Sequence, residues 1–314
     1  MAPVFNLGVD LGGTKTEARL FDAQGLEVWR ERQPTPAGDY RGTLVLLSAL
    51  VAQARIRRDG LDAAAPLTVG MGTPGTVAAS GLMKNCNSTC LNGMPLQADF
   101  ERSIGQPVRL ANDANCLALS EAFDGAGTGA RVVFAAILGT GTGAGIVIDG
   151  RLLSGPNGLA GEWGHNPLPW GLPGEDPEFA CYCGKRHCVE SLVSGPGLAR
   201  EHALRHGGSL DAITIAARAT QGDADCAATL QRHAGRLARA LAAVINLLDP
   251  DVIVLGGGLS AMAHLYTQVP AQWAQWVFAA GAQEPLRTRL LPARHGDASG
   301  VRGAAWLWRQ AGAA

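Results

Sequence analysis

Cysteine and histidine side chains gather in one stretch of this sequence. It begins Glu162-Trp-Gly-His165 and ends Cys181-Tyr-Cys183-Gly-Lys-Arg-His-Cys188-Val-Glu190. Thiolate and imidazole are the ligands that tetrahedral zinc prefers, and a structural zinc site closes with four of them. The set of His165, Cys181, Cys183 and Cys188 is therefore complete, although its spacing is tighter than the paired C-x2-C of common zinc fingers. Three buried thiols beside a surface histidine are the alternative, and His187 could replace His165 as the ligand.

Three glycine clusters follow apolar runs, and we call them the first (Gly12-Gly13), second (Gly139–Gly143) and third (Gly256–Gly258) glycine turns. Successive amides without a β-carbon in the way can form a cradle for an anion. Any one cluster is most simply a tight turn, but the three together predict a polyphosphate bound between two lobes. None fits the P-loop pattern or a full dinucleotide fingerprint. Asp10 precedes the first turn, where it either accepts from turn amides or binds magnesium beside the phosphates.

The candidate general base lies within the segment Arg109-Leu-Ala-Asn-Asp-Ala-Asn115, which leads into the helix-like run 116–123. Asn112 and Asp113 stand at the expected helix start, where an N-cap is their simplest role. A helix start would also keep Asp113 ionised and therefore only weakly basic. A weak base suffices for phosphoryl transfer, because the attacking hydroxyl loses its proton late in a loose transition state.

Alternating and apolar runs predict the elements that carry these residues. Strands are expected over 4–10, 15–21 and 26–32, followed by a helix over 40–58 and a strand over 67–71. The pattern starts again with strands over 132–138, 144–148 and 151–154, an amphipathic helix over 230–248 and a strand over 252–255. We therefore expect an α/β protein of two similar lobes with a cleft between them, and a last helix over 300–310 that crosses back to the first lobe.

Length and composition agree with this picture. The chain has 314 residues, 47% of them apolar, which is enough for two cores. A net charge of −1 excludes an electrostatic reason for a nucleic-acid or membrane-surface partner. The sequence pattern leads us to expect neither secretion nor a membrane-spanning segment. Seven cysteines, an odd number, then indicate reduced thiols plus a metal site, and we expect a cytoplasmic protein.

Six motifs in order over nearly the whole chain resemble those of the ROK family of sugar kinases. They are Asp10-Leu-Gly-Gly-Thr-Lys15, Leu110-Ala-Asn-Asp-Ala-Asn115, Leu138-Gly-Thr-Gly141, Glu162-x-Gly-His165, the cysteine run to Glu190, and Leu255-Gly-Gly-Gly258. The resemblance implies a two-lobed ribonuclease-H-like (actin/hexokinase) ATPase fold with duplicated βββαβα units and a zinc-bound loop. It places residues 1–112 and 299–314 in the N-terminal lobe and residues 113–298, with the zinc loop at 162–190, in the C-terminal lobe.

The same resemblance implies ATP and magnesium, a structural zinc, a homodimer, and transfer of the γ-phosphoryl group to a hexose 6-hydroxyl. By position it assigns the catalytic base to Asp113. It assigns the sugar contacts to Gly75, Asn112, Asp113, Glu162, His165 and Glu190. It assigns the nucleotide and magnesium contacts to Asp10, Gly12, Gly13, Thr14, Lys15, Thr140, Gly141, Gly256, Gly257 and Gly258, and the zinc ligands to His165, Cys181, Cys183 and Cys188. The family usually has glycine where this chain has His187.

Within the family, three segments look most like bacterial fructokinases of the manno(fructo)kinase type: 84–93, 161–170 and 295–306. Fructose is therefore the expected sugar, with mannose or glucose slower. Cys90 replaces a tryptophan that is common there and leaves the preference open, with an N-acetylglucosamine kinase or glucokinase of the same family as the alternative. A sugar-sensing regulator without turnover is the alternative of another class. It is disfavoured because only nine residues precede Asp10, too few for a DNA-binding helix-turn-helix.

Overall fold

The first of two five-stranded sheets is built mainly from the N-terminal third of the chain. The computed structural model describes residues 4–278 and 284–310, so residues 1–3 and 311–314 of the expected first lobe and 279–283 of the second lie outside it. The sheet has the order β3-β2-β1-β4-β7. Its strands are β1 (Phe5–Leu11), β2 (Lys15–Phe21), β3 (Glu27–Pro34), β4 (Leu67–Thr73) and β7 (Val108–Asn112). A two-stranded hairpin, β5 (Thr76–Val77) and β6 (Met83–Lys84), follows β4.

The second sheet repeats the first in order and direction. Its order is β10-β9-β8-β11-β12, with β8 antiparallel to β9 and parallel to β11, as β1 is to β2 and β4. The strands are β8 (Val132–Leu138), β9 (Thr142–Ile148), β10 (Arg151–Leu152), β11 (Val252–Gly256) and β12 (Arg289–Pro292). The expected repeat is therefore confirmed in the topology. The fifth strand of each sheet, β7 or β12, was not expected from the sequence.

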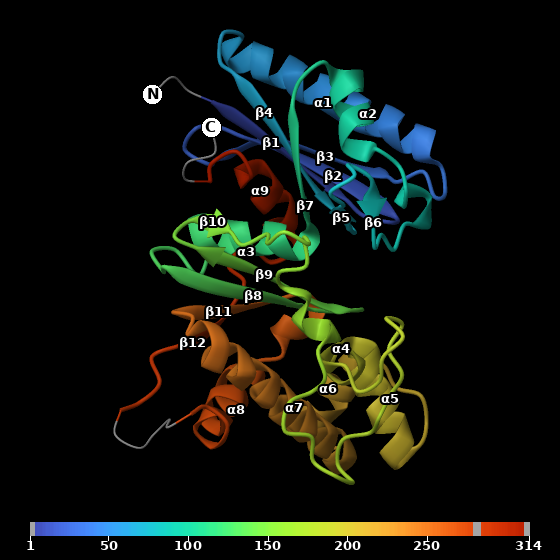
Figure 1. Cartoon of the computed structure of the whole chain (residues 1–314), viewed down its shortest axis with the longest axis vertical. Helices are drawn as coiled ribbons and strands as arrows, with labels where there is room; N and C mark the ends of the chain where they lie inside the picture. Colours follow the sequence, from blue (N-terminus) through green and yellow to red (C-terminus); the bar gives the residue numbers. More distant parts are fainter. Residues whose placement is uncertain (1–3, 279–283, 311–314) are drawn as a thin grey trace.

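Helices cover both faces of each sheet, which gives the layered arrangement of Figure 1. Helices α1 (Tyr40–Asp62) and α2 (Leu96–Ile104) cover the outer face of the first sheet, and α3 (Asp113–Phe123) and α9 (Ser299–Trp306) lie between the two sheets. The helices beyond the second sheet are α4 (Val189–Val193), α5 (Gly195–His206), α6 (Ala212–Thr220), α7 (Ala224–Leu248) and α8 (Leu265–Gln272). Within the described ranges, no helix combines the length and apolarity needed to cross a membrane.

The last helix returns to the first sheet, as the sequence predicted. It packs so closely that glycine is required at the contacts. A β-carbon on Gly8 of β1 would lie 1.9 Å from the carbonyl oxygen of Val301, and one on Gly70 of β4 would lie 1.9 Å from that of Ala304. A β-carbon on Gly303 would lie 1.7 Å from the carbonyl oxygen of Cys116 in α3. Backbone therefore lies on backbone where α9 meets both the first sheet and α3.

Each sheet has its own apolar core. Leu47, Leu50 and Val51 of α1 are buried against β1 and β4 in the first core. The long helix α7 fills the second core, with a buried face that includes Leu237, Leu241 and Ile245. Asp223 caps α7 by accepting from the amides of Asp225 and Cys226, so the helix begins six residues before the periodicity predicted. These rigid cores position the turns and helix ends described below.

Candidate functional site

A cavity of about 590 Å³ opens beside the first glycine turn and contains the predicted base. Five of the predicted site residues line it together: Asp10, Gly12, Gly13, Thr14 and Asp113. The others that line it are Leu11, Ala37, Gly38, Thr73, Pro74, Asn87, Ser88, Thr89 and Cys90. We call it the Asp113 cavity. It is large enough for a small ligand.

The first glycine turn is a tight connection between β1 and β2. The amide of Gly12 donates to the carbonyl oxygen of Lys15 at 3.0 Å, and a β-carbon on Gly12 would lie 2.7 Å from that oxygen. The hydroxyl of Thr35 donates to the carbonyl oxygen of Gly12 at 2.8 Å. A β-carbon on Gly13 would lie 3.3 Å from Oγ of Ser88, which also lines the cavity. The turn is held from behind, so its shape is set before any ligand arrives.

Asn112 and Asp113 occupy the start of α3, as the sequence predicted. Asn112 is the N-cap, and its side-chain oxygen accepts from the amide of Asn115 at 2.8 Å. Asp113 is the first helical residue, and its Oδ1 accepts from the amide of Ala114 at 2.8 Å. The cap leaves the side-chain NH2 of Asn112 as a donor. Helix α3, which lies between the two sheets, thereby holds a carboxylate and an amide beside each other.

Burial opposes the predicted effect of the helix start, which is to keep Asp113 ionised. The side chain of Asp113 faces the open cavity, but protein surrounds it on the other sides, and this desolvation raises the pKa of its carboxyl. The amides of Ala114 and of Asp113 itself oppose that rise without cancelling it. Desolvation and, after it, the charge of Asp113 also raise the pKa of Asp10 to about 6. The two carboxyl groups therefore face one cavity and oppose each other's ionisation.

The far wall of the cavity was missed in the site prediction. Asn87 to Cys90 follow the β5–β6 hairpin, and the side chain of Asn92 fixes this segment by bonding both the amide and the carbonyl oxygen of Cys86, at 2.8 and 3.0 Å. Gly75 lies directly behind it, since a β-carbon there would lie 2.5 Å from the carbonyl oxygen of Lys84. The polar run Asn85-Cys-Asn-Ser-Thr89 is typical of a loop, and segment 84–93 entered the sequence analysis only through its likeness to fructokinases.

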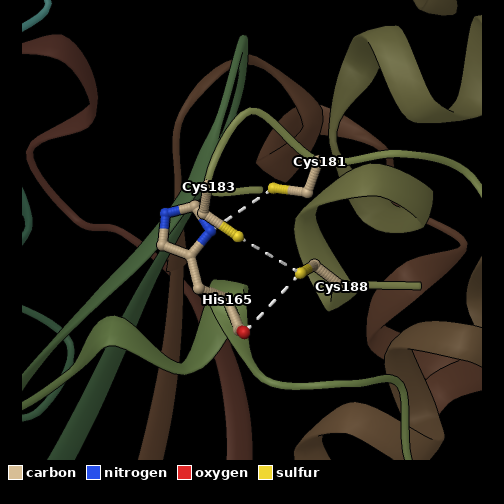
Figure 2. A group of neighbouring side chains, drawn as sticks. All are labelled: His165, Cys181, Cys183 and Cys188. Carbon is tan, nitrogen blue, oxygen red and sulfur yellow. Dashed lines mark hydrogen bonds between the residues drawn. The ribbon is translucent and has the colours of Figure 1, made fainter. Parts of the chain in front are cut away.

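The four predicted metal ligands come together in the structure, as Figure 2 shows. Their donor atoms all lie within 4.8 Å of one another. Nδ1 of His165 is 3.5 Å from Sγ of Cys181, and the Sγ atoms of Cys183 and Cys188 are 3.7 Å apart. Of the three thiols only that of Cys188 is buried, which disfavours the alternative of three buried thiols. The donor group includes His165 and not His187, which faces Gly171 instead.

The metal loop, residues 162–190, is attached to the second glycine turn. Oε2 of Glu190 accepts from the amide of Thr142 at 2.8 Å, and a β-carbon on Gly141 would lie 2.8 Å from that same oxygen. At the other end of the loop, a β-carbon on Gly161 or Gly164 would lie 2.0 Å from a carbonyl oxygen of β9. Both ends of the loop are therefore fixed to the hairpin that carries the second turn and Thr140.

The third glycine turn is explained mostly by packing. A β-carbon on Gly256 would lie 2.7 Å from Cδ2 of Leu117. Gly257 has a φ of +80°, and a β-carbon there would lie 2.5 Å from the carbonyl oxygen of Leu138. Gly258 has open space around it. Among the residues that the structure describes, the lining of the Asp113 cavity includes neither this turn nor Lys15, Gly75, Asn112, Thr140, Gly141, Glu162, His165 and Glu190.

Comparison with known proteins identifies the family. The ROK family model matches residues 6–311. The chain belongs to the ROK family. It is 38% identical to an N-acetyl-D-glucosamine kinase of Pectobacterium atrosepticum, over 96% of this chain and 97% of that protein. It superposes on a ROK hexokinase from Thermus thermophilus with a TM-score of 0.80 and 30% identity, over 96% of both chains. A ROK-family glucokinase from Streptomyces griseus, crystallised with glucose and AMPPNP, superposes with a TM-score of 0.75 and 29% identity, over 98% of this chain and 99% of that one.

These comparisons settle the expected ROK fold and correct the expected subfamily. The hexokinase-like α/β fold with its two mixed sheets is shared over nearly the full length. The expected likeness to fructokinases is not supported, since similar curated relatives of this ROK protein are N-acetyl-D-glucosamine kinases. The three segments on which that expectation rested include the hairpin wall, part of the metal loop and the start of α9.

Proposed function

We propose that this protein transfers the γ-phosphoryl group of ATP to the 6-hydroxyl of N-acetylglucosamine. Sugar kinase activity rests on membership of the ROK family and on kinase relatives of full length. The choice of N-acetylglucosamine rests on the relatives that are 37–38% identical over 96% of the chain. Glucose is the second candidate, because the glucokinase from Streptomyces griseus shares 29% of its sequence over 98% of this chain.

The observation that carries the proposal is the position of Asp113, at the first turn of α3 and in one cavity with the first glycine turn. A phosphoryl transfer needs little more from the protein than positioning, charge stabilisation and a group that accepts the hydroxyl proton. Asp113 would accept that proton as the sugar oxygen attacks phosphorus. Because desolvation raises its pKa, Asp113 is a stronger base than an ordinary aspartate.

Asp10 fits the magnesium role. Its carboxyl lies near enough to Asp113 for the two negative charges to oppose each other, and a divalent cation beside Asp10 would remove that opposition. When bound, magnesium would neutralise charge on the β- and γ-phosphates. The amide of Gly13, in a turn held by Lys15 and Thr35, would donate to a phosphate oxygen from the same side.

We propose zinc for the cysteine–histidine cluster. At tetrahedral angles, sulfur atoms about 2.3 Å from zinc lie about 3.7–3.8 Å apart, and a nitrogen at about 2.0–2.1 Å lies about 3.5–3.6 Å from a sulfur. The observed separations are 3.7 Å for Cys183 and Cys188 and 3.5 Å for Cys181 and His165. The four ligands leave no open position, as in a structural site. The ion would hold Glu162, His165 and Glu190 in place and take no part in the transfer.

Sugar recognition is assigned to the groups that the lobes present toward one another. Glu190 is fixed by the amide of Thr142 through one oxygen, which leaves the other to accept from a sugar hydroxyl. Glu162, at the opposite end of the metal loop, is a second acceptor, and the free NH2 of Asn112 is a donor beside the base. Gly75 would let the sugar approach the backbone closely. A site with several such groups strongly rejects analogues that lack the matching hydroxyls.

The decisive experiment is a series of kcat/KM values with magnesium and ATP over N-acetylglucosamine, glucose, mannose, fructose and N-acetylmannosamine. We expect N-acetylglucosamine to give the highest value. A higher value for fructose would overturn the choice of sugar and leave the kinase assignment standing. Purified protein that forms no ADP with any of these sugars would overturn the kinase assignment itself. The expected homodimer is tested separately by sedimentation equilibrium.

A further inference from the structure

Tyr182 holds an unusual position between two of the cluster cysteines. Its side chain is 79% exposed, yet its hydroxyl lies 3.0 Å from Nε2 of His165 and its ring meets the imidazole edge to face, with centroids 5.1 Å apart. The neighbouring backbone is a tight turn, in which the amide of Cys181 donates to the carbonyl oxygen of Lys185 at 2.9 Å. An exposed aromatic side chain is thus placed by the cluster that flanks it.

The hydroxyl of Tyr182 also lies among the predicted sugar contacts. It bonds His165, and Glu162 begins the short 3-10 helix that contains His165. Sγ of Cys181, the residue before Tyr182, lies 4.0 Å from Oε1 of Glu190. The predicted sugar contacts are therefore neighbours of the phenol hydroxyl. The carboxylates of Glu162 and Glu190 are acceptors only. They can accept hydrogen bonds from the hydroxyl groups of a sugar, but they cannot donate one to an acceptor group of the sugar.

The direction of the hydrogen bond to His165 follows from the metal site. Nδ1 of the imidazole is the atom that faces Cys181, while the other ring nitrogen points away from the three sulfurs, as Figure 2 shows. A histidine that binds a metal through Nδ1 carries its proton on Nε2. Nε2 is then the donor to Tyr182 and the phenol oxygen is the acceptor. The phenol proton remains free to donate to a third group.

We propose that Tyr182 is a specificity-determining residue, positioned by His165, whose hydroxyl donates to an acceptor-only group of the sugar. The carbonyl oxygen of an N-acetyl substituent is such a group, whereas the hydroxyl that glucose carries in its place can also satisfy Glu162 or Glu190. His165 in this arrangement acts through Tyr182, although its position in the family motif predicted a direct sugar contact. The inference rests on the proposed function, because it concerns the sugar that the kinase accepts.

Tyr182→Phe tests the inference, since it removes one hydroxyl and keeps the ring. We expect KM and the calorimetric Kd for N-acetylglucosamine to rise about tenfold, the effect of losing one hydrogen bond. The values for glucose should change less than about threefold, and kcat, KM for ATP and metal content should stay as in the wild type. Tyr40→Phe is the matched control, because it removes a phenol that bonds Asp99 far from the metal loop and should change neither sugar.

Three results would overturn the role of Tyr182. The first is an unchanged or lower Kd for N-acetylglucosamine, and the second is an equal rise of Kd for both sugars. The third is a loss of metal from the variant, which would show that Tyr182 only stabilises the metal site. Calorimetry separates this inference from the proposed function. Wild-type protein that binds N-acetylglucosamine without transfer would overturn the kinase reaction and leave the test of Tyr182 intact. Wild-type protein that binds neither sugar would overturn both.

Discussion

The first and second glycine turns occupy the same place in two repeated units but have different partners. The first turn, between β1 and β2, opens on the Asp113 cavity and is held by Lys15 and Thr35. The second, between β8 and β9, is covered by Glu190, whose carboxylate bonds the amide of Thr142. One unit thus presents its turn to the reacting groups, while the other uses its turn to hold the metal loop.

This difference shows how a repeated topology can support two tasks. The strand order fixes where a turn lies, and the segment that folds over the turn determines what it does. In the first unit that segment is the β5–β6 hairpin with Asn87 to Cys90, and in the second it is the metal loop. Changes in the first unit should therefore affect the transfer step, and changes in the second should affect affinity for the sugar. Three predictions test that division, from the largest expected effect to the smallest, and a fourth tests the environment of Asp10 in the first unit.

Asp113→Asn should lower kcat about 1000-fold while ATP and sugar still bind, because it removes the proton acceptor and keeps the side-chain shape. Steady-state rates and calorimetric affinities check this. The matched control is Asp149→Asn in the turn after β9, where φ is +50° and asparagine is well tolerated. Protonation of Asp113 removes the base, and burial raises the pKa of Asp113. As pH is lowered, wild-type kcat/KM should therefore begin to fall at a pH above the ordinary aspartate range. Near wild-type turnover by Asp113→Asn would show that another group is the base.

Cys181→Ser should release the metal and raise KM for the sugar about 100-fold, with KM for ATP changed little. Without the metal, Glu162, His165 and Glu190 are no longer held together, and a displacement of about 1 Å at a binding group can cost that much. Elemental analysis of the purified variant and its kinetics check the result. Cys226→Ala, which changes a buried cysteine of α7, should keep the metal. Wild-type protein purified without chelator that contains no zinc would contradict the assignment of the ion.

Gly141→Ala should raise KM for the sugar about tenfold, because the new β-carbon would lie 2.8 Å from Oε2 of Glu190 and displace a predicted sugar contact. Gly139→Ala is the matched control in the same turn, since a β-carbon there meets nothing within 4 Å. Kinetics of both variants with one sugar decide the matter. Equal effects from the two substitutions would mean that the second turn acts through its own backbone and not through Glu190.

Asp10→Asn should stabilise the fold by about 1–3 kcal/mol at pH 7.5. The pKa of Asp10 is raised to about 6 in the folded protein, from an ordinary value of 3.8. Ionisation therefore destabilises the folded state as pH rises from about 4 to about 6. The difference in the free energy of unfolding between variant and wild type should reach its full size above about pH 6 and be absent below about pH 4. Urea unfolding at several pH values measures it. A variant that is no more stable than the wild type at pH 7.5 would mean that the surroundings of Asp10 do not oppose its ionisation.

The sequence predicted the elements whose pattern is long and regular. The strands over 15–21 and 132–138 have the predicted bounds, and the N-cap role of Asn112 is confirmed. Strands β7 and β12 were missed because four or five residues show too little alternation, and α5 was missed because it begins Gly195-Pro196-Gly197. The ligand cluster could be predicted because metal chemistry restricts residue types. The wall formed by Asn87 to Cys90 and the position of Tyr182 could not, because both depend on how a loop folds over a distant turn.

The glycines beneath α9 have a mechanical consequence. At Gly8, Gly70 and Gly303 the backbone of the helix lies directly on β1, β4 and α3, so a rotamer change of a side chain does little there to absorb a displacement. Side chains elsewhere between the lobes can repack when the lobes move. We therefore expect any opening or closing of the two lobes to be a rotation about an axis close to α9, with little sliding along it.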